Sequence, residues 1–390
     1  SQSYLRNTAV LRTTLTDERG DSLEILDFAP RFRQYGRMYR PAAFFRLVRP
    51  LSGCPRIRVR LRPTAEEGGR RATAVLGSNH ARNDCGGSAL RLTTNAPITH
   101  VAAERPFRLE SPVAFFLGPD EPFSSDVLAD AERLLRATED YWREWVRTLT
   151  LPLDWQEAVI RAAIALKLCA FEETGAIIAA MTTSIPEAPG TQRNWDYRYC
   201  WIRDAYYVVR ALNRLGAVDM LENYLLYLRN LVDQSGGGDV QPVYAVDLEP
   251  ELHERISIGL MGYRGMGPVR MGNEAHKQRQ HDVYGQIILP LVQSFFDHRL
   301  LRMGDVADFR ALEPLGERAF ALFDQPDAGL WEFRTIARVH TYSALLCWAA
   351  CDRLSNAAEA LGLVERRLHW RSRADAIHQR IEAAAWNEEA

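Results

Sequence analysis

The segment Arg193–Gly216, RNWDYRYCWIRDAYYVVRALNRLG, concentrates residue types that could bind a polar ligand just before a helical pattern. Its first half contains Trp195, Asp196, Tyr197, Arg198, Tyr199, Trp201, Arg203 and Asp204. A solvated face would not need this many aromatic rings, and a dry core would not accept unpaired aspartates and arginines. The mixture indicates a polar pocket floored by aromatic side chains. A buried structural cluster of ion pairs is the alternative that these residues leave open.

A second segment, Tyr263–Asn273 (YRGMGPVRMGN), is followed by Gln280–Gly285 (QHDVYG). Its glycines do not match the spacing of a phosphate-binding loop, and no strand–turn–helix pattern surrounds them. The segment is therefore an ordered loop that offers Arg264 and Arg270 to a ligand. A structural loop with solvated arginines is the alternative.

A third segment, Asp327–Thr335 (DAGLWEFRT), lies between two helical patterns and places Glu332 between Trp331 and Phe333. An acid between two aromatic rings suits a general acid, because exclusion of water favours the protonated carboxyl group. The alternative is a glutamate that caps a helix or pairs with Arg334.

The first 120 residues are predicted to form an antiparallel β-sandwich. Leu23–Pro30 (LEILDFAP) alternates apolar and polar residues, and Arg56–Pro63 (RIRVRLRP) alternates arginines with Ile, Val and Leu. Period-two alternation is the pattern of a half-buried strand. The Gly- and Asn-rich stretch Gly77–Ser88 (GSNHARNDCGGS) predicts a loop between strands.

Helical patterns follow, which argues for separate β and α domains and not for a parallel α/β fold. Residues 121–150 predict a linker helix, with apolar and aromatic residues recurring at three- and four-residue intervals. Residues 151–390 predict a helical domain interrupted by a long Gly-rich loop, Ser235–Asn273. Helices are expected at 202–215, 218–233, 281–298, 307–323, 340–357 and 361–385.

Composition excludes several classes of protein. The net charge of −2 argues against a nucleic-acid partner, because no excess of basic residues is present. No apolar run is long enough to span a membrane. The histidines lack metal-ligand spacing, so no metal is expected. None of the six cysteines forms a C-x-x-C pair, which favours a reducing, cytoplasmic location.

Taken together, Asn194–Asp204 (NWDYRYCWIRD), Tyr263–Asn273 and the sequence GLWEFR around Glu332 resemble glycoside hydrolase family 15. This family comprises the glucoamylases and bacterial relatives such as trehalases and glucodextranases. The resemblance is strong over Asp154–Arg353, and the pattern Tyr141, Trp142 and Trp145 in the linker helix also fits.

The resemblance implies an N-terminal β-sandwich followed by an (α/α)6 toroid of twelve helices. It implies that Glu332 is the general acid and that Arg203 and Asp204 hold a terminal glucosyl unit. The other residues that it places at the substrate are Tyr197, Trp201, Trp331, Arg264 and Arg270.

The implied activity is exo-acting, inverting hydrolysis of α-glucosidic bonds with release of β-D-glucose, and no cofactor is needed. The substrate would be a polysaccharide, oligosaccharide or disaccharide with a terminal α-glucosyl unit. An α,α-trehalase is the alternative within enzymes. A catalytically silent carbohydrate-binding or scaffold protein is the alternative from another class. Assembly into a homo-oligomer is left open.

Inverting hydrolysis needs a second carboxylate, about 6.5–9.5 Å from the acid, to activate water. The resemblance places this general base near the C-terminal end of the barrel, outside this chain. The family's opening segment before the strand at Tyr4 is also missing, so the resemblance implies a sequence that is incomplete at both ends. If the base lies within it, Glu172, Glu173 and Asp282 are the first candidates.

Overall fold

The computed structural model describes residues 1–123 and 126–387. The chain divides into two compact units. The β unit comprises Ser1–Ala165 with Ser257–Met261, and the helical unit comprises Leu166–Ile256 with Gly262–Ala390. An antiparallel sheet followed by a helical region confirms the predicted fold at this level of detail. The predicted boundaries at residues 120 and 150 stay predictions.

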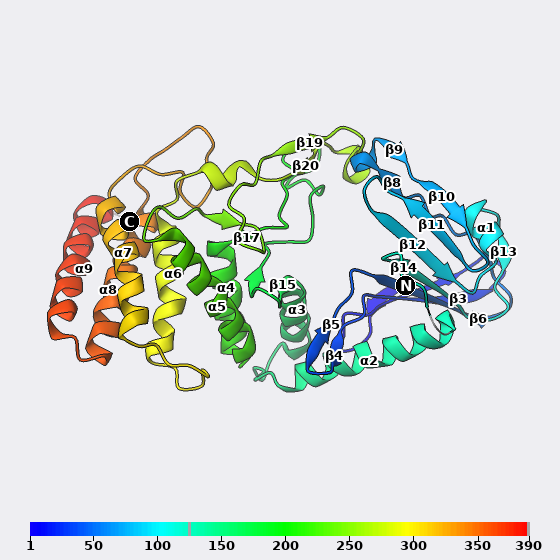
Figure 1. Cartoon of the computed structure of the whole chain (residues 1–390), viewed down its shortest axis with the longest axis horizontal. Coiled ribbons are helices and arrows are strands. Elements are labelled where there is room, and N and C mark those ends of the chain that lie inside the picture. Colours follow the sequence, from blue (N-terminus) through cyan, green and yellow to red (C-terminus); the bar gives the residue numbers. More distant parts are fainter. Residues whose placement is uncertain (124–125, 388–390) are drawn as a thin grey trace. The chain divides into compact units, whose positions relative to one another are not determined.

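An eight-stranded antiparallel sheet dominates the β unit (Figure 1). From one edge to the other its strands are β1 (Gln2–Tyr4), β2 (Leu11–Thr16), β3 (Ser22–Phe28), β6 (Phe44–Ser52), β14 (Val113–Gly118), β12 (Ala89–Thr94), β11 (His80–Asp84) and β10 (Thr73–Leu76). The predicted strand at Leu23–Pro30 is present as β3.

Short two-stranded ladders and one short helix complete the β unit. They are β4 (Phe32–Gln34) with β5 (Arg37–Tyr39), β7 (Arg56–Ile57) with β13 (Phe107–Arg108), β8 (Thr64–Ala65) with β9 (Arg70–Arg71), and α1 (Ile98–Ala102).

A helix, α2 (Val127–Arg147), is present where a linker helix was predicted, and it packs against the sheet of the β unit. Asp126 caps it, because its carboxylate accepts a hydrogen bond of 3.0 Å from the backbone amide of Leu128. Leu134 and Leu135 lie in one buried cluster with Phe45 of β6. Burial of this apolar stripe holds the helix on the sheet, since hydrophobic burial is the main favourable term in folding.

The segment Arg56–Pro63 differs from its prediction in one respect. Only Arg56–Ile57 forms a strand, although the alternation of burial continues to Pro63. Ile57, Val59 and Leu61 pack towards a buried cluster on the sheet. The pattern therefore correctly predicted which side chains face the sheet, where they are partly buried, but backbone pairing stops early.

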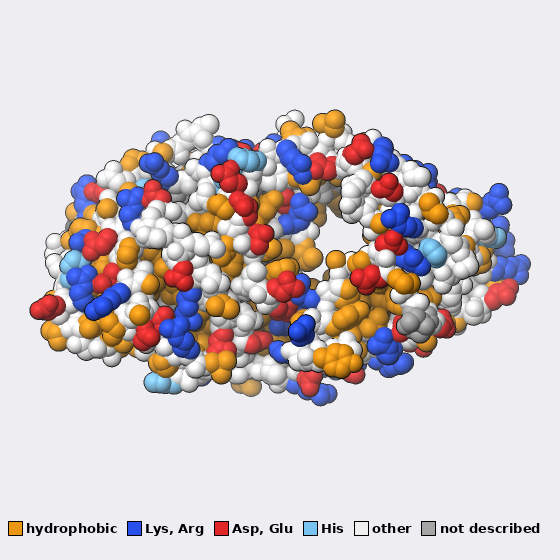
Figure 2. Space-filling view, viewed as in Figure 1, with side chains coloured by type: hydrophobic (Ala, Val, Ile, Leu, Met, Phe, Trp, Pro, Cys, Tyr) orange, Lys and Arg blue, Asp and Glu red, His pale blue; other side chains and the backbone are white. Residues whose placement is uncertain are grey.

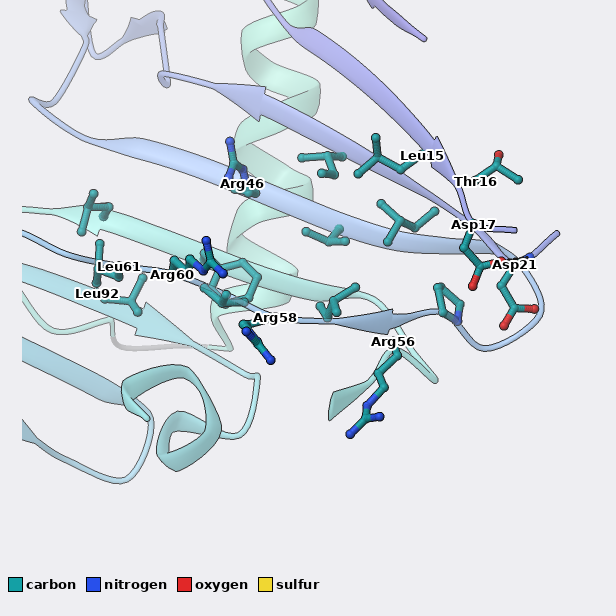
Figure 3. A pocket seen from close by; sticks show the side chains of 18 of the residues that line it. Leu15, Thr16, Asp17, Asp21, Arg46, Arg56, Arg58, Arg60, Leu61 and Leu92 are labelled. Carbon is teal, nitrogen blue, oxygen red and sulfur yellow. Dashed lines mark hydrogen bonds between the residues drawn. The ribbon is translucent and has the colours of Figure 1, made fainter. Parts of the chain in front are cut away.

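A cavity of about 660 Å³ lies between this segment and the sheet. Figure 3 shows Leu61 beside Leu92 on its inner side, while Arg56 and Arg58 point away from the sheet. Asp17 and Asp21 lie together at one end. The walls are mainly aliphatic, and Phe44 and Phe115 add two aromatic rings.

The predicted loop Gly77–Ser88 is wrong, because its centre forms strand β11. The glycines of this stretch lie only at its two ends. Gly77 lies at the first end, and Gly86 and Gly87, with positive φ angles of 76° and 87°, lie at the second. His80–Asp84 pairs with β10 on one side and β12 on the other. Turn-forming residues therefore marked two hairpin turns and not one continuous loop.

Helices dominate the second unit (Figure 1). They are α4 (Ile202–Arg214), α5 (Val218–Ser235), α6 (Asp282–Val292), α7 (Val306–Leu322), α8 (Thr341–Ala360) and α9 (Val364–Ala385), preceded by α3 (Gln156–Leu168) at the boundary of the two units. The short ladders are β15 (Ala170–Phe171) with β16 (Ala176–Ile177), β17 (Cys200–Trp201) with β18 (Val243–Tyr244), and β19 (Arg255–Ser257) with β20 (Val269–Met271).

The helices form two rows. Helices α4, α6 and α8 contact one another in sequence, and each packs against the helix that follows it in the chain. Helix α6 is buried on nearly every face, so it is the centre of this arrangement. Gly285 permits the close approach of α8, because a Cβ atom there would lie 2.3 Å from the carbonyl oxygen of Leu346.

Charged side chains of both signs are interspersed over the visible face of each unit (Figure 2). Cys347 and Cys351 are fully buried in α8, as small core residues. Within the described ranges, none of the helices combines the length and apolarity that crossing a bilayer requires.

Candidate active site

The candidate site lies where three helices of one row begin. Helix α4 starts at Ile202 directly after the β17–β18 ladder, α6 starts at Asp282, and α8 starts at Thr341. All three helices present their N-terminal turns to the loops that carry the sequence motifs. The partial positive charge of a helix N-terminus stabilises nearby carboxylates.

Glu332 sits on a loop whose ends are joined by a bridge between Asp327 and Arg338. The backbone of Glu332 has a φ angle of 55°, which lies in the left-handed region that residues other than glycine rarely adopt. Its amide donates to the carbonyl of Gly329 at 3.1 Å, which fixes this conformation. Such strain costs about 1–3 kcal/mol and concentrates at functional sites.

Two side chains from the start of α4 hold the Glu332 carboxylate. The indole of Trp201 donates to Oε1 at 2.8 Å, and Nη2 of Arg203 donates to the same oxygen at 2.7 Å. Among the described residues, Oε2 has no hydrogen-bond partner. The carboxylate is thus anchored through one oxygen and leaves the other to a ligand.

Arg203 connects this carboxylate to two more acids and an amide. Its Nη1 donates to Oε1 of Gln280 at 2.8 Å and lies 3.9 Å from Oδ2 of Asp282. Its Nε lies 3.6 Å from Oδ2 of Asp204. A planar guanidinium with five donors is suited to this role.

The surroundings shift the pKa of both aspartates upwards. Desolvation raises the pKa of Asp282 to about 6, with Arg203 opposing the shift and Asp327 adding to it. Desolvation also raises the pKa of Asp204, against the opposing effect of Arg203 and with a contribution from Glu332. The side chain of Asp204 still exposes 43% of its surface, so solvent screens part of this effect on its pKa.

A cavity of about 600 Å³ opens beside Glu332. It is lined by Glu187, Arg193, Trp195, Tyr197, Trp201, Asn273, Ala275, Gln278, Trp331, Glu332, Phe333 and Arg334. The structure therefore brings together Tyr197, Trp201, Trp331 and Glu332, with Arg203 directly behind. Aromatic walls with a few convergent polar groups are typical of small-molecule sites.

Part of the Arg193–Gly216 segment stabilises the fold and does not line the cavity. Asp196 is fully buried and accepts hydrogen bonds from Nε and Nη2 of Arg198, both at 2.9 Å, and from the amide of Gly272. Asn273 donates to the carbonyl of Asp196 at 3.2 Å. Both alternatives raised by the sequence are thus present in one segment.

Arg270 also stabilises the loops around the cavity. It donates to Glu254 at 2.9 Å and to the carbonyls of Gln192 and Asn194. Its guanidinium stacks on one face of Trp195, and Arg334 lies 4.4 Å from the centroid of the same ring. Arg270 therefore fixes a cavity wall from behind.

Arg264 is not brought to the cavity. It lies on an exposed 3-10 turn, Tyr263–Gly265, with its guanidinium over the ring of Tyr263. The substrate contact inferred for it stays a prediction.

Several cavity residues were not singled out from the sequence, chiefly Glu187 and Gln278, and Arg193 was named only as the first residue of the motif segment. They come from loops without a periodic pattern, so no spacing marked them. Of the candidates for a general base, Glu172 and Glu173 do not line the cavity, and Asp282 is buried behind Arg203. Within residues 1–123 and 126–387, no three His, Cys, Asp or Glu side chains cluster as a metal site would require.

The fold and these motifs agree with a known family. Residues 154–390 match the model of Glycosyl hydrolases family 15. The chain belongs to this family.

Three of the proteins that this chain resembles are named trehalases. A trehalase of Thermoplasma volcanium is 31% identical over 97% of this chain and 60% of its own length. A trehalase of Thermoplasma acidophilum is 35% identical over 62% of this chain and 41% of its own length. A trehalase of Mycobacterium tuberculosis is 35% identical over 63% of this chain and 36% of its own length. The chain thus spans about a third to three fifths of the length of these relatives.

Proposed function

We propose that this protein hydrolyses α,α-trehalose, with Glu332 as general acid. The observation that carries the proposal is the carboxylate of Glu332, held through Oε1 by Trp201 and Arg203 at the wall of a cavity. A positioned acid that keeps one oxygen for the reacting group is what protonation of a glycosidic oxygen requires.

We propose trehalose as the substrate in place of the longer α-glucans that the sequence motifs favoured. The residues around Glu332 do not separate the two substrates, since both present a terminal glucosyl unit. The three related proteins named above are all called trehalases, and this favours the disaccharide.

In the proposed reaction, one glucose ring lies against Trp201 and Tyr197, with Asp204 and Arg203 binding its hydroxyl groups. Oε2 of Glu332 gives its proton to the bridging oxygen, and the second glucose leaves. Water attacks the anomeric carbon from the opposite face and inverts it. A second carboxylate takes up the proton of this water as it attacks.

We further propose that the sheet and the helical rows are parts of a β-sandwich and an (α/α)6 toroid. The alternating contacts of α4, α6 and α8 and the packing of each on its successor support this architecture. In such a toroid the catalytic loops would lie at one end of the helices, beside the N-terminal turns of α4, α6 and α8.

Glucose release from α,α-trehalose, maltose and maltotriose by the natural-length protein tests the function. Proton NMR should show α- and β-glucose appearing in equal amounts from trehalose, because only one of the two rings is inverted. Release of α-glucose alone would refute inversion. Faster cleavage of maltotriose would restore the glucoamylase reading, and binding without turnover would favour a silent carbohydrate-binding protein.

A further inference from the structure

A second polar group faces the same cavity, on a loop that the reaction described above does not use. Glu187 and Arg193 both line the cavity. Oε2 of Glu187 lies 2.6 Å from Nη2 of Arg193, and Oε1 accepts a hydrogen bond of 2.9 Å from the hydroxyl of Tyr197. The carboxylate is therefore fixed through both of its oxygens.

The loop itself is held in shape. The amide of Glu187 donates to the carbonyl of Arg193 at 3.0 Å, and the hydroxyl of Thr191 donates to the carbonyl of Ala188 at 2.8 Å. The loop thus presents the ion pair as a preformed unit, and little conformational entropy would be lost when a ligand binds.

Tyr197 separates this pair from the proposed reaction centre. Its ring lies 5.9 Å from that of Trp201, which donates to Glu332, and its hydroxyl donates to Glu187. Desolvation and Glu187 both raise the pKa of Tyr197, so the phenol stays protonated as a donor. Two carboxylates therefore lie on either side of one aromatic pair in a single cavity.

The pair retains hydrogen-bonding capacity. A carboxylate has about four lone-pair sites, and a guanidinium has five donors. Arg193 exposes 67% of its side chain and Glu187 exposes 35%. Together they offer an acceptor and a donor to neighbouring hydroxyl groups, while Trp331, 77% exposed, offers a flat apolar face.

We infer that Glu187, oriented by Arg193 and Tyr197, binds the hydroxyl groups of the second, departing glucose ring and so determines specificity for a disaccharide. The inference rests on the proposed hydrolysis of trehalose. An apolar leaving group would make no use of a fixed ion pair, whereas a second sugar ring would use both its charges and the aromatic face.

The test compares two substrates that share the first glucosyl ring. α,α-Trehalose has a hydroxyl-rich leaving group, and 4-nitrophenyl α-D-glucopyranoside has an aromatic one. We expect Glu187→Ala to lower kcat/KM for trehalose about tenfold or more, since a lost hydrogen bond to a charged group has this effect. The value for the aryl glucoside should stay unchanged, and Glu187→Gln should recover part of the loss.

The matched control is Glu365→Gln, because Glu365 is exposed at the start of α9. This variant should leave kcat/KM unchanged for both substrates. An equal loss with both substrates would overturn the inference and make Glu187 a structural residue, and so would undiminished trehalose cleavage by Glu187→Ala. If the unmodified protein cleaves only the aryl glucoside, the inference fails while Glu332 as acid survives. If it cleaves neither substrate, the proposed function fails with it.

Discussion

The two units each contain a cavity, and the two cavities are similar in size but differ in the side chains that line them. The cavity of the β unit measures about 660 Å³ and has mainly aliphatic walls. That of the helical unit measures about 600 Å³ and has carboxylates, arginines and four indole or phenol rings in its walls. The first lies under regular strands and one extended segment, and the second is built from loops at helix ends.

The comparison shows that the volume of a cavity does not indicate whether it is a catalytic site. The sheet supplies side chains that alternate between two faces, so its aliphatic residues gather on the face that lines the cavity, with Arg46 among them. Loops can direct acids, amides and aromatic rings to one point, because their backbone is not bound to a period. Substitutions of matched size should therefore affect activity in one cavity and only stability in the other.

The largest expected effect is the loss of activity in Glu332→Gln. The amide keeps the size of the side chain but cannot donate the acid proton, so kcat should fall about 10²–10⁴-fold. Steady-state kinetics on trehalose measure the effect. Asp21→Asn, in the cavity of the β unit, is the matched control and should keep normal turnover. Near-normal kcat in Glu332→Gln would exclude Glu332 as the acid.

Loss of Arg203 should be next in size. Arg203→Ala removes one of the two anchors of Glu332 and the cation beside Asp282, and kcat/KM should fall about 10- to 100-fold. Asp204→Asn should act in the same direction. Arg198→Ala provides the contrast, because Arg198 pairs with buried Asp196. Arg198→Ala should lower Tm and leave the kinetics of the folded protein unchanged. If instead Arg198→Ala lowers kcat/KM and Arg203→Ala lowers only Tm, Arg198 belongs to the site and Arg203 is structural.

Asp282 should make stability depend on pH. Burial raises the pKa of its carboxyl group to about 6 in the folded protein, whereas an exposed aspartate has a pKa of about 3.9. The folded state therefore holds the proton more tightly, and stability should fall as pH rises from about 4 to about 6. The loss is on the order of 3 kcal/mol. Asp282→Asn should flatten this part of the Tm profile, and an unchanged slope would show that another group causes it.

The smallest effect is expected in the β unit. Val59→Ala removes part of the apolar wall formed by the Arg56–Pro63 segment and should lower the free energy of unfolding by about 1 kcal/mol. Arg58→Ala, which points away from the sheet, should stay within about 0.5 kcal/mol. Urea titration measures both. A change of kcat/KM in either variant would contradict the separation of the two cavities.

Much of the fold could be predicted because burial follows sequence periods. The helical patterns at 202–215 and 218–233 correspond closely to α4 and α5. The strand at Arg56–Pro63 was only half predicted, because alternation reports which face is buried and not whether a neighbouring strand accepts hydrogen bonds. The error at Gly77–Ser88 has a similar cause, since residue type marked the turns but not the paired residues between them.

The candidate site was predicted in part. Residues within one motif, such as Tyr197, Trp201 and Arg203, are neighbours in sequence and stay neighbours in space. The contacts of Glu332 with Trp201 and of Arg203 with Gln280 join loops far apart in the chain, and no spacing encodes them. Glu187 and Arg193 belong to a loop whose place beside the cavity becomes visible only when the contact of Tyr197 with Glu187 is known.

The left-handed backbone at Glu332 also limits how this position can change by descent. Single-nucleotide changes in a glutamate codon lead, among others, to glycine, aspartate and valine. Glycine and aspartate accept a positive φ far more readily than a β-branched residue does. A lineage in which selection for hydrolysis has ceased should therefore drift towards Gly or Asp here. Val should appear only where other substitutions have first raised the stability of the protein.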